Sequence, residues 1–400
     1  MKLHRHLVLA TVECLRSIFV DGHHADKAVE YTFRHHPKWG RRDRHFVAST
    51  IFEMVRWWRH LWALLGENPQ AEESAINRVL ALYLKKSGYD LPDWLPLNLS
   101  ATELDLRVGR VRGERALWHS VPDWLDQLGV GEFGEAWEPI LESLNQPASV
   151  VLRANRLKIK RDELRDKLLS EGIITHPVVE LPDALILAER ENIFRSQAFQ
   201  VGECEVQDGS SQLIAPLLGV KPGMRVIDAC AGAGGKTLHL AALMQNSGRI
   251  IALDVSEKKL AELKRRGRRS GVTNCETRVI ESQKVIKRLH DSADRVLLDV
   301  PCSGLGVLRR NPDTKWKMNP ERLAALKQIQ QTLLRDYSRM VKRGGALVYA
   351  TCSILPEENQ QQIEHFLSLH PEWEFQEEVK IMPHLSPFDG FYGARLYRRT

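Results

Sequence analysis

The chain has 400 residues, of which 43% are hydrophobic and 27% charged, and its formal net charge is +6 at pH 7. This length is typical of two or three domains, and the composition is that of a globular protein. The positive charge permits a polyanionic partner without requiring one. Six cysteines with no CxxC pair argue against a disulfide framework and against a zinc cluster. We therefore expect a reduced, intracellular protein without a metal site.

The amino terminus starts with basic residues, but the apolar stretch 7–12 ends at Glu13. It is too short for a signal peptide or a membrane span, and no later run approaches 18 uninterrupted apolar residues. The sequence therefore predicts a cytoplasmic protein that does not enter membranes. We also expect a monomer.

Residues 1–145 are predicted to form a helical domain, because apolar residues recur at helical spacing over 7–19 and 46–58. Asp93 and Asp123 each follow a proline, which favours two helix starts. Basic residues are interleaved with tryptophans between positions 38 and 59: Lys38, Arg41, Arg42, Arg44, Arg56, Arg59, Trp39, Trp57 and Trp58. The cluster fits an RNA-binding face. It fits a helical bundle with a solvated basic side and buried tryptophans equally well.

Two further domains are predicted after residue 145. Residues 146–205 fit a small α+β, RRM-like module with a strand at 150–155, a helix at 163–171 and short strands within 177–187. This module binds RNA or acts as a structural spacer. Residues 206–400 alternate strands with helices, with clear strands at 226–228, 250–254, 295–299 and 346–350 and helices at 256–269 and 320–341. That alternation predicts a doubly wound parallel sheet of Rossmann-like type.

A glycine-rich turn, DACAGAGGKT at 228–237, follows the first of these strands. Such a turn lets the backbone approach a ligand at a helix N-terminus. A Walker loop would need glycine at Cys230, and a dinucleotide fingerprint would need glycine at Thr237. Asp254 ends the next strand, where an acidic side chain can accept hydrogen bonds from ribose hydroxyls. The pattern favours a nucleoside cofactor without a pyrophosphate, S-adenosylmethionine.

Two cysteines follow predicted strands, Cys302 in LDVPCSG and Cys352 in ATCS. Reacting groups gather at this end of the strands in open α/β sheets, although free cysteines are often only buried packing residues. Carbon 5 of a pyrimidine has no lone pair, and a thiolate that adds to carbon 6 makes it nucleophilic. A carboxyl group at the N3/N4 edge then stabilises the developing charge, and a base removes the C5 proton. Cys352, Asp299 and Cys302 supply this set, and Lys236 can lower a thiol pKa or contact the base.

Six ordered motifs carry a resemblance to a known family: VQDGSSQ (206–212), DACAGAGGKT (228–237), LDVPCSG (298–304), RNPDTKW (310–316), ATCSILPEEN (350–359) and DGFYGA (389–394). On these motifs, residues 145–400 resemble the RsmB/Sun-type RNA cytosine-C5 methyltransferases. The first 145 residues more loosely resemble the NusB-like helical domain of some members, chiefly through GRRDR at 40–44.

The resemblance implies roles for individual residues. Cys352 would be the nucleophile, Cys302 would assist product release, and Asp299 would contact the target cytosine, with Lys236 also in the catalytic set. The cofactor would be held by Cys230, Ala231, Gly232, Ala233, Gly234, Gly235, Lys236, Asp254, Lys259, Glu281 and Asp299. Glu281 falls near the position where the family usually has an aspartate that contacts adenine. Gly232 and Ala233 stand where many members have Ala-Pro.

The leading interpretation is an S-adenosylmethionine-dependent enzyme that forms 5-methylcytosine in RNA. The NusB-like domain favours ribosomal RNA, with 16S RNA first and transfer RNA as the alternative. A non-catalytic RNA-binding assembly factor is disfavoured by the two cysteines, Asp299 and the glycine turn. The missing glycine at Cys230 disfavours a small NTPase, and an exocyclic-amine methyltransferase has no need of two thiols. Residues after the Cys302 loop are candidate RNA contacts: Arg309, Arg310, Lys315, Trp316 and Lys317. The basic run 258–269 is interpreted as an exposed helix face.

Overall fold

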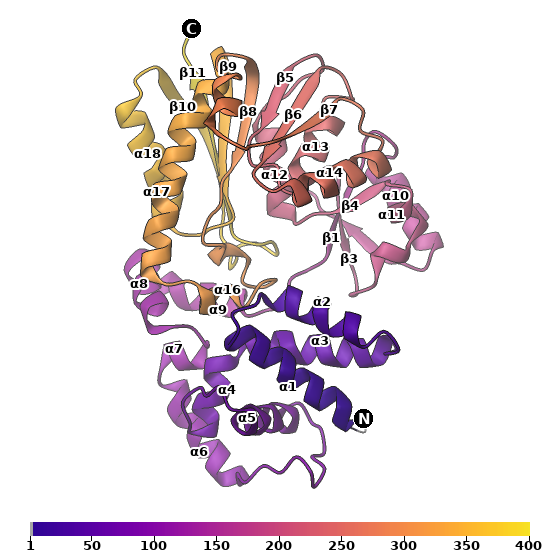
Figure 1. Cartoon of the computed structure of the whole chain (residues 1–400), viewed down its shortest axis with the longest axis vertical. Coiled ribbons are helices and arrows are strands. Elements are labelled where there is room, and N and C mark those ends of the chain that lie inside the picture. Colours follow the sequence, from indigo (N-terminus) through magenta and orange to yellow (C-terminus); the bar gives the residue numbers. More distant parts are fainter. Residues whose placement is uncertain (1–2) are drawn as a thin grey trace. The chain divides into compact units, whose positions relative to one another are not determined.

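The computed structural model describes residues 3–400 and divides into two units (Figure 1). One unit comprises the chain up to Gln146 together with Leu308–Pro320, and the other comprises Pro147–Val307 and Glu321–Thr400. Among the described residues, no helix has the length and apolar character needed to cross a bilayer. These described residues also contain no cluster of three or more His, Cys, Asp or Glu side chains that could hold a metal ion.

The first unit is built from helices. Their bounds are α1 (Arg5–Phe19), α2 (Ala25–His35), α3 (Arg41–Arg56), α4 (Trp58–Leu65), α5 (Glu73–Lys86), α6 (Ala101–Arg112), α7 (Arg115–Trp118), α8 (Asp123–Phe133), α9 (Trp137–Leu144) and α16 (Thr314–Lys317). The helix start expected at Asp93 is wrong, because α6 begins only at Ala101. There Ser100 and Glu103 form a capping box, which fixes the start better than a preceding proline does. The second expected start is correct, since α8 begins at Asp123.

The basic and aromatic cluster at 38–59 divides between core and surface. Trp58 is buried and stacks on Phe19 with ring centroids 3.9 Å apart. The Arg56 side chain is also buried. Lys38 and Arg41 are exposed. The buried members belong to the helical core, and only the exposed cations remain available to a polyanion.

The segment that follows the Cys302 loop belongs to this helical unit, and the burial of Arg309 and Lys315 corrects the assignment of these two residues as RNA contacts. Lys315 is 1% exposed, and its Nζ atom donates to the Arg56 carbonyl at 2.8 Å, at the C-terminal end of α3. Burial lowers the pKa of Lys315 well below its usual value. The Trp316 indole donates to the Val55 carbonyl at 2.7 Å, and Arg309 is also buried. These side chains satisfy carbonyl groups at a helix end, which a basic residue does well.

The second unit starts with the small α+β module. Its antiparallel sheet has the order β2-β3-β1-β4, from β1 (Val151–Ala154), β2 (Thr175–Pro177), β3 (Ala184–Leu187) and β4 (Cys204–Val206), with α10 (Arg161–Ser170) and α11 (Gln197–Gln200). The buried Arg153 guanidinium on β1 donates to the Gly235 carbonyl at 2.9 Å. Glu205 on β4 accepts from Arg266 at 2.9 Å. The module therefore stabilises the glycine turn, directly through Arg153 and indirectly through Arg266, which also donates to the Ala233 carbonyl.

The large sheet has the order β10-β11-β9-β8-β5-β6-β7. Its strands are β5 (Arg225–Asp228), β6 (Arg249–Asp254), β7 (Cys275–Val279), β8 (Ala293–Asp299), β9 (Val341–Thr351), β10 (Trp373–Ile381) and β11 (Phe391–Arg398). Strands β5 to β9 pair in parallel, whereas β11 pairs antiparallel with β9 and β10. The sheet is thus mixed rather than wholly parallel as expected, because the short 382–390 connection joins β10 and β11 as a hairpin.

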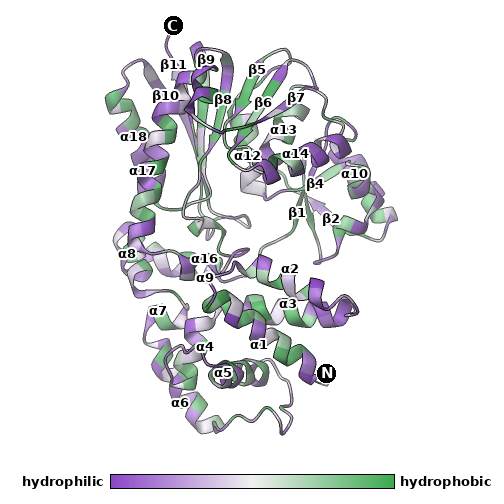
Figure 2. Ribbon diagram, viewed as in Figure 1, coloured by the Kyte–Doolittle hydropathy of each residue, from purple (hydrophilic) through white to green (hydrophobic). Residues whose placement is uncertain are grey.

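Helices cover both faces of this sheet (Figure 1). Helices α12 (Gly209–Leu217), α13 (Gly235–Leu243) and α14 (Glu257–Ser270) lie on one side, and α15 (Gln283–Lys287), α17 (Pro320–Tyr337) and α18 (Gln360–Leu369) on the other. Strand residues alternate between the two cores, so that Leu298 packs on one side and Leu297 on the other. Figure 2 shows hydrophobic residues along β5 and β6 and hydrophilic ones on α14. The parallel strands bring their C-terminal ends to one edge.

Candidate active site

The turn after β5 is shaped by glycines in left-handed conformations. Gly232 has φ +54° and Gly234 has φ +89°. A Cβ atom at Gly234 would lie 2.5 Å from Leu263 Cγ, so this glycine is needed for packing as well as for conformation. A Cβ at Gly232 or Gly235 would meet nothing within 4 Å, so the backbone there borders open space.

Asp254, at the end of β6, fixes this turn. Its Oδ2 atom accepts from the Gly232 N–H at 2.8 Å, and its Oδ1 atom accepts from the Ser256 N–H at 2.8 Å. Each carboxylate oxygen has a second lone pair, so the side chain can also accept from a ligand hydroxyl. The contact with ribose stays a prediction.

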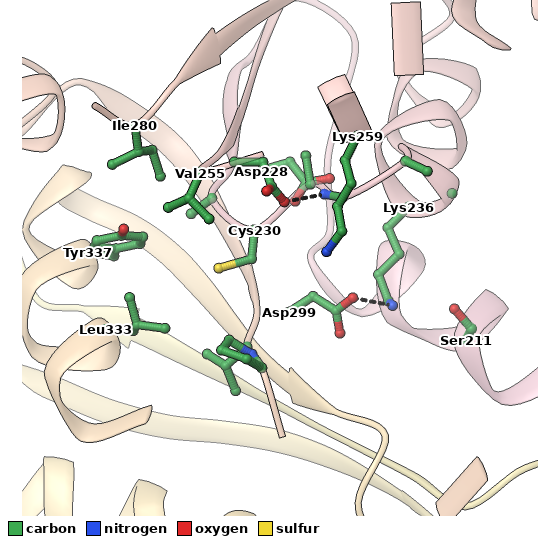
Figure 3. A pocket seen from close by; sticks show the side chains of 18 of the residues that line it. Ser211, Asp228, Cys230, Lys236, Val255, Lys259, Ile280, Asp299, Leu333 and Tyr337 are labelled. Carbon is green, nitrogen blue, oxygen red and sulfur yellow. Dashed lines mark hydrogen bonds and ion pairs between the residues drawn. The ribbon is translucent and has the colours of Figure 1, made fainter. Parts of the chain in front are cut away.

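A cavity of roughly 610 Å³ opens above the turn, within the second unit (Figure 3). Nine of the predicted cofactor residues line it: Cys230, Ala231, Gly232, Ala233, Gly235, Lys236, Asp254, Lys259 and Asp299. Gly234 does not line it, and its missing side chain makes room for Leu263 instead. Glu281 is exposed and is also outside the lining, where its neighbour Ile280 takes part.

Lys236 and Asp299 form an ion pair at the rim of this cavity, with Nζ and Oδ2 2.6 Å apart. The lysine comes from the first turn of α13 and the aspartate from the last residue of β8. Lys236 Nζ also lies 4.8 Å from the centroid of the Phe391 ring. In Figure 3 this pair faces the apolar side chains of Ile280, Leu333 and Tyr337 across the cavity. One wall is therefore charged and the other apolar.

The two cysteines meet beyond the C-terminal ends of β8 and β9, outside the cavity lining. Asp299 and Ala350 are paired in the β8–β9 register, so Cys302 and Cys352 follow equivalent positions on neighbouring strands. Their Sγ atoms lie 3.3 Å apart, and both are free thiols. The bond with Cys352, together with burial, raises the pKa of the Cys302 thiol well above its ordinary value. Cys302 therefore keeps its proton and can donate it to the sulfur of Cys352 in a hydrogen bond.

Comparison with known sequences identifies the family. Residues 215–397 match the family described as 16S rRNA methyltransferase RsmB/F, and residues 121–193 match the ferredoxin-like domain of RsmF/B-like methyltransferases. The probable ribosomal RNA small subunit methyltransferase B of Synechocystis sp. is 31% identical over 436 residues, which cover 96% of this chain and 97% of that protein. The chain belongs to the RsmB/F family.

Other similar proteins agree with this assignment. The probable ribosomal RNA small subunit methyltransferase B of Bacillus subtilis is 36% identical over 68% of this chain and 65% of that protein. A crystal structure described as a methyltransferase homolog from Pyrococcus horikoshii is 27% identical with a TM-score of 0.64, over 72% of this chain and 98% of the other. The expected Rossmann-like methyltransferase fold is thus confirmed, and S-adenosylmethionine is the methyl donor of this RsmB/F protein.

The cavity of this RsmB/F protein fits that donor. The open space above Gly232 and Gly235 leaves backbone groups accessible, and the apolar wall suits an adenine ring. Asp228 is 1% exposed and lines the cavity. Its Oδ2 atom accepts from Thr237 at 2.6 Å, whereas Oδ1 has no partner among the described residues. A buried acceptor without a donor suits a ligand ammonium group.

The sequence reading missed several lining residues. Asp228 carried a signal, because it ends its strand as Asp254 and Asp299 end theirs. Burial raises its pKa to about 7. Ile329, Leu333 and Tyr337 come from one face of α17. Their i, i+4, i+8 spacing predicts an apolar stripe, but it does not reveal that the stripe faces a ligand.

Cys230 lines the cavity, whereas Cys302 and Cys352 are not among its lining residues. Burial and the nearby carboxylates of Asp299, Asp228 and Asp254 raise its pKa above the ordinary value. A protonated thiol is a poor nucleophile. Its surroundings therefore favour contact with the cofactor over covalent chemistry.

Proposed function

We propose that this protein transfers a methyl group from S-adenosylmethionine to carbon 5 of a cytosine in the RNA of the small ribosomal subunit. The contact between the Cys302 and Cys352 sulfur atoms carries this proposal, because Cys302 directly follows Pro301, a residue of the cavity lining. Methylation of a nitrogen or an oxygen needs no thiol, whereas carbon 5 of a pyrimidine needs a covalent nucleophile. The names of the Synechocystis and B. subtilis relatives support ribosomal RNA as the substrate.

In the first step, the Cys352 thiolate adds to carbon 6 of the cytosine. A carbon–sulfur bond forms, and the electron pair of the C5–C6 double bond becomes available at carbon 5. The Cys302 S–H lies within hydrogen-bond distance of the attacking sulfur, but the addition itself requires only the Cys352 thiolate. S-adenosylmethionine, when bound, supplies a methyl group that carbon 5 can take.

Asp299 orients the base for this addition. Its carboxyl group hydrogen-bonds the N3/N4 edge of the cytosine and stabilises the charge that develops on the ring. The ammonium group of Lys236 donates to Asp299 Oδ2 at 2.6 Å and so holds the carboxyl group in place. Lys236 belongs to the cofactor turn, so its ion pair with Asp299 ties the carboxyl group that contacts the base to that turn.

Product release then falls to Cys302. When Cys352 has become a thioether, it no longer carries a negative charge, and that change removes the contributions of Cys352 that raise the pKa of Cys302, the largest of which is the hydrogen bond. Cys302 can then lose its proton to solvent. Its thiolate takes the proton from carbon 5, the double bond re-forms, and the bond between carbon 6 and sulfur breaks. Cys352 leaves as a thiolate, so the enzyme is restored.

The other domains would deliver the RNA. The exposed cations Lys38, Arg41 and Arg42 of the helical domain are candidates for phosphate contacts. We place domain boundaries near residues 145 and 205, and we assign RNA binding to both the helical domain and the small α+β module. We place the enzyme in the cytoplasm, where ribosomal RNA is its substrate, and expect it to work as a monomer.

Trapping tests this function. RNA that contains 5-fluorocytosine cannot lose a proton from carbon 5, so the enzyme should remain covalently bound to it in the presence of S-adenosylmethionine. We expect a stable protein–RNA complex with the wild-type enzyme and none with Cys352→Ala. Bisulfite sequencing of small-subunit ribosomal RNA from a deletion strain should lose one 5-methylcytosine signal. An unchanged rRNA pattern would move the substrate to another RNA, and absence of any trapped complex would contradict the chemistry.

A further inference from the structure

Glu358 is a buried carboxylate next to the cysteine pair. It is 0% exposed and lies six residues after Cys352 in the loop that follows β9. Its carboxylate accepts from the Ser303 N–H at 2.8 Å and from the Ser303 hydroxyl at 2.5 Å. It also accepts from Gln330 Nε2 at 2.9 Å. No ion pair neutralises it among residues 3–400, so hydrogen bonds alone compensate its burial.

These hydrogen bonds surround Cys302. Ser303 is the residue directly after Cys302, and Gln330 also donates to the Pro301 carbonyl, directly before it, at 3.1 Å. Gln330 comes from α17 and is itself fully buried. The side chains of Glu358 and Gln330 thus hold the backbone on both sides of one cysteine.

The position of Cys352 depends on other contacts. Asn359 Nδ2 donates to the Ser353 carbonyl at 3.0 Å, and Asn359 Oδ1 accepts from the Thr351 hydroxyl at 2.5 Å. Cys352 directly follows β9, an interior strand of the large sheet. Loss of the Glu358 side chain therefore loosens the Cys302 loop and leaves the Cys352 backbone in place.

We propose that Glu358 is a positioning residue for product release, which holds the Cys302 sulfur against Cys352 and the target base. This inference rests on the proposed cytosine-C5 chemistry. It assigns to Glu358 the second half of the reaction only, because Cys352 can add to carbon 6 without a fixed Cys302. Misplacement of a reacting group by about 1 Å can cost roughly a hundredfold in rate.

The charge of Glu358 has a further consequence. The ionisable groups that face Cys302 are Cys352, Glu358 and the Tyr349 hydroxyl. The bond with Cys352 and burial are the larger causes that raise the pKa of Cys302, and the negative charge of Glu358 adds to them. An amide at position 358 would remove that charge, so the pKa of Cys302 would fall.

Two substitutions separate position from charge. Glu358→Ala removes both. Glu358→Gln keeps the hydrogen bonds, because its oxygen can accept from the Ser303 N–H and from Gln330 while its amide donates to the Ser303 hydroxyl. That hydroxyl can turn its own proton to Ser353 Oγ, which lies 3.2 Å away. Glu357→Gln is the matched control, since the side chain of the neighbouring Glu357 pairs with Lys327 of α17 at 2.5 Å.

The experiment measures two rates on the full-length enzyme with S-adenosylmethionine. Formation of the covalent complex is followed with 5-fluorocytosine RNA, and release is followed with unmodified RNA by the fraction of protein that remains attached. We expect Glu358→Ala to form the complex within about threefold of wild type but to release product roughly tenfold to a hundredfold more slowly. Attached protein should then accumulate on unmodified RNA. Glu358→Gln should release product at a near wild-type rate, with its pH profile moved to lower pH.

Each other result has a clear meaning. Release by Glu358→Ala at the rate of the Glu357→Gln control would overturn the inference. The inference would also be contradicted if Glu358→Ala slowed complex formation and release equally, and if Glu358→Gln showed the same loss with the wild-type pH profile. Such a result would indicate a general packing defect, which acts on both steps. If the wild-type enzyme itself forms no complex with 5-fluorocytosine RNA, the proposed function fails. If wild type forms the complex and Cys302→Ala accumulates attached to unmodified RNA, the proposed function holds, and the Glu358 variants then test only the role of Glu358.

Discussion

The Sγ atoms of Cys302 and Cys352 lie 3.3 Å apart at the ends of neighbouring parallel strands. This distance is a hydrogen-bond contact between thiols and exceeds the roughly 2.05 Å of a disulfide. The pair keeps a proton on Cys302, because the pKa of that thiol is raised by Cys352 and by burial. Two adjacent thiols, one of which holds its proton more firmly than an ordinary cysteine, can divide nucleophilic attack and proton removal between them.

Removal of Cys302 should stop the reaction after methyl transfer. We expect Cys302→Ala to add to carbon 6 and to accumulate as a covalent complex with unmodified RNA, because no thiolate takes the C5 proton. Turnover should fall by about a hundredfold or more. Denaturing electrophoresis of enzyme, RNA and S-adenosylmethionine measures the complex. Cys275→Ala, at a free cysteine on β7 outside the site, is the control and should leave turnover unchanged.

The Lys236–Asp299 pair should matter for the addition step itself. We expect Asp299→Asn and Lys236→Met to lower the rate of complex formation with 5-fluorocytosine RNA by about tenfold to a hundredfold, because the base edge loses its oriented partner. Asp294→Asn is a matched control, since Asp294 pairs with Lys342 at the opposite end of the same strand. Complex formation at the control rate in both variants would contradict the assigned role.

Asp228 should link cofactor binding to pH. Its folded-state pKa is about 7, raised by burial from an ordinary value near 3.8. The folded protein therefore binds a proton that the unfolded chain has released, and the free energy of unfolding without cofactor should fall as pH rises from about 4 to about 7. Binding of S-adenosylmethionine should strengthen over the upper part of that range, because the deprotonated carboxylate accepts from the ligand ammonium group.

Calorimetry of Asp228→Asn measures both effects. The variant should lose the pH dependence of binding and bind S-adenosylmethionine about tenfold more weakly at pH 8. Without cofactor it should unfold at a higher temperature than wild type at that pH. Tighter cofactor binding by the variant at pH 8 would show that Oδ1 has no ligand to accept from.

The glycine turn offers a steric test. Gly234→Ala requires φ +89° of a residue with a side chain and brings its Cβ to 2.5 Å from Leu263. We expect a loss of about 1–3 kcal/mol in the free energy of unfolding and weaker binding of S-adenosylmethionine. Gly267→Ala is the control, because it lies inside α14 and its Cβ would meet Leu238 at 3.9 Å. That variant should be neutral or slightly stabilising, since alanine favours a helix.

Much of this site follows from the sequence, because parallel strands end at a common edge. Asp254, Asp299 and Cys352 each end or follow an apolar run, so their approach is a consequence of the alternating pattern. The need for glycine at position 234 also follows from the sequence, because it lies in a tight turn between a strand and a helix. A left-handed residue is needed there whatever packs around it.

Contacts between distant segments were not predictable in the same way. Ser303 and Glu358 are 55 residues apart and meet only because β8 and β9 are neighbours. Lys315 looked like a surface cation, yet it is buried against the end of α3, 259 residues away. Nothing in the local pattern of residues 308–320 distinguishes a buried helix cap from an RNA contact. Glu281 was assigned from the resemblance, because it falls near the position of the family's aspartate, and it is the preceding residue, Ile280, that lines the cavity.

The most direct measurement identifies the residue that bonds to the base. Wild-type enzyme is trapped on 5-fluorocytosine RNA, digested with protease and nuclease, and analysed by tandem mass spectrometry for the peptide that carries the nucleotide. We expect the added mass on Cys352, in the peptide that also contains Thr351 and Ser353. A nucleotide attached to Cys302, or to Cys230 in the cofactor turn, would contradict the division of work between the two thiols.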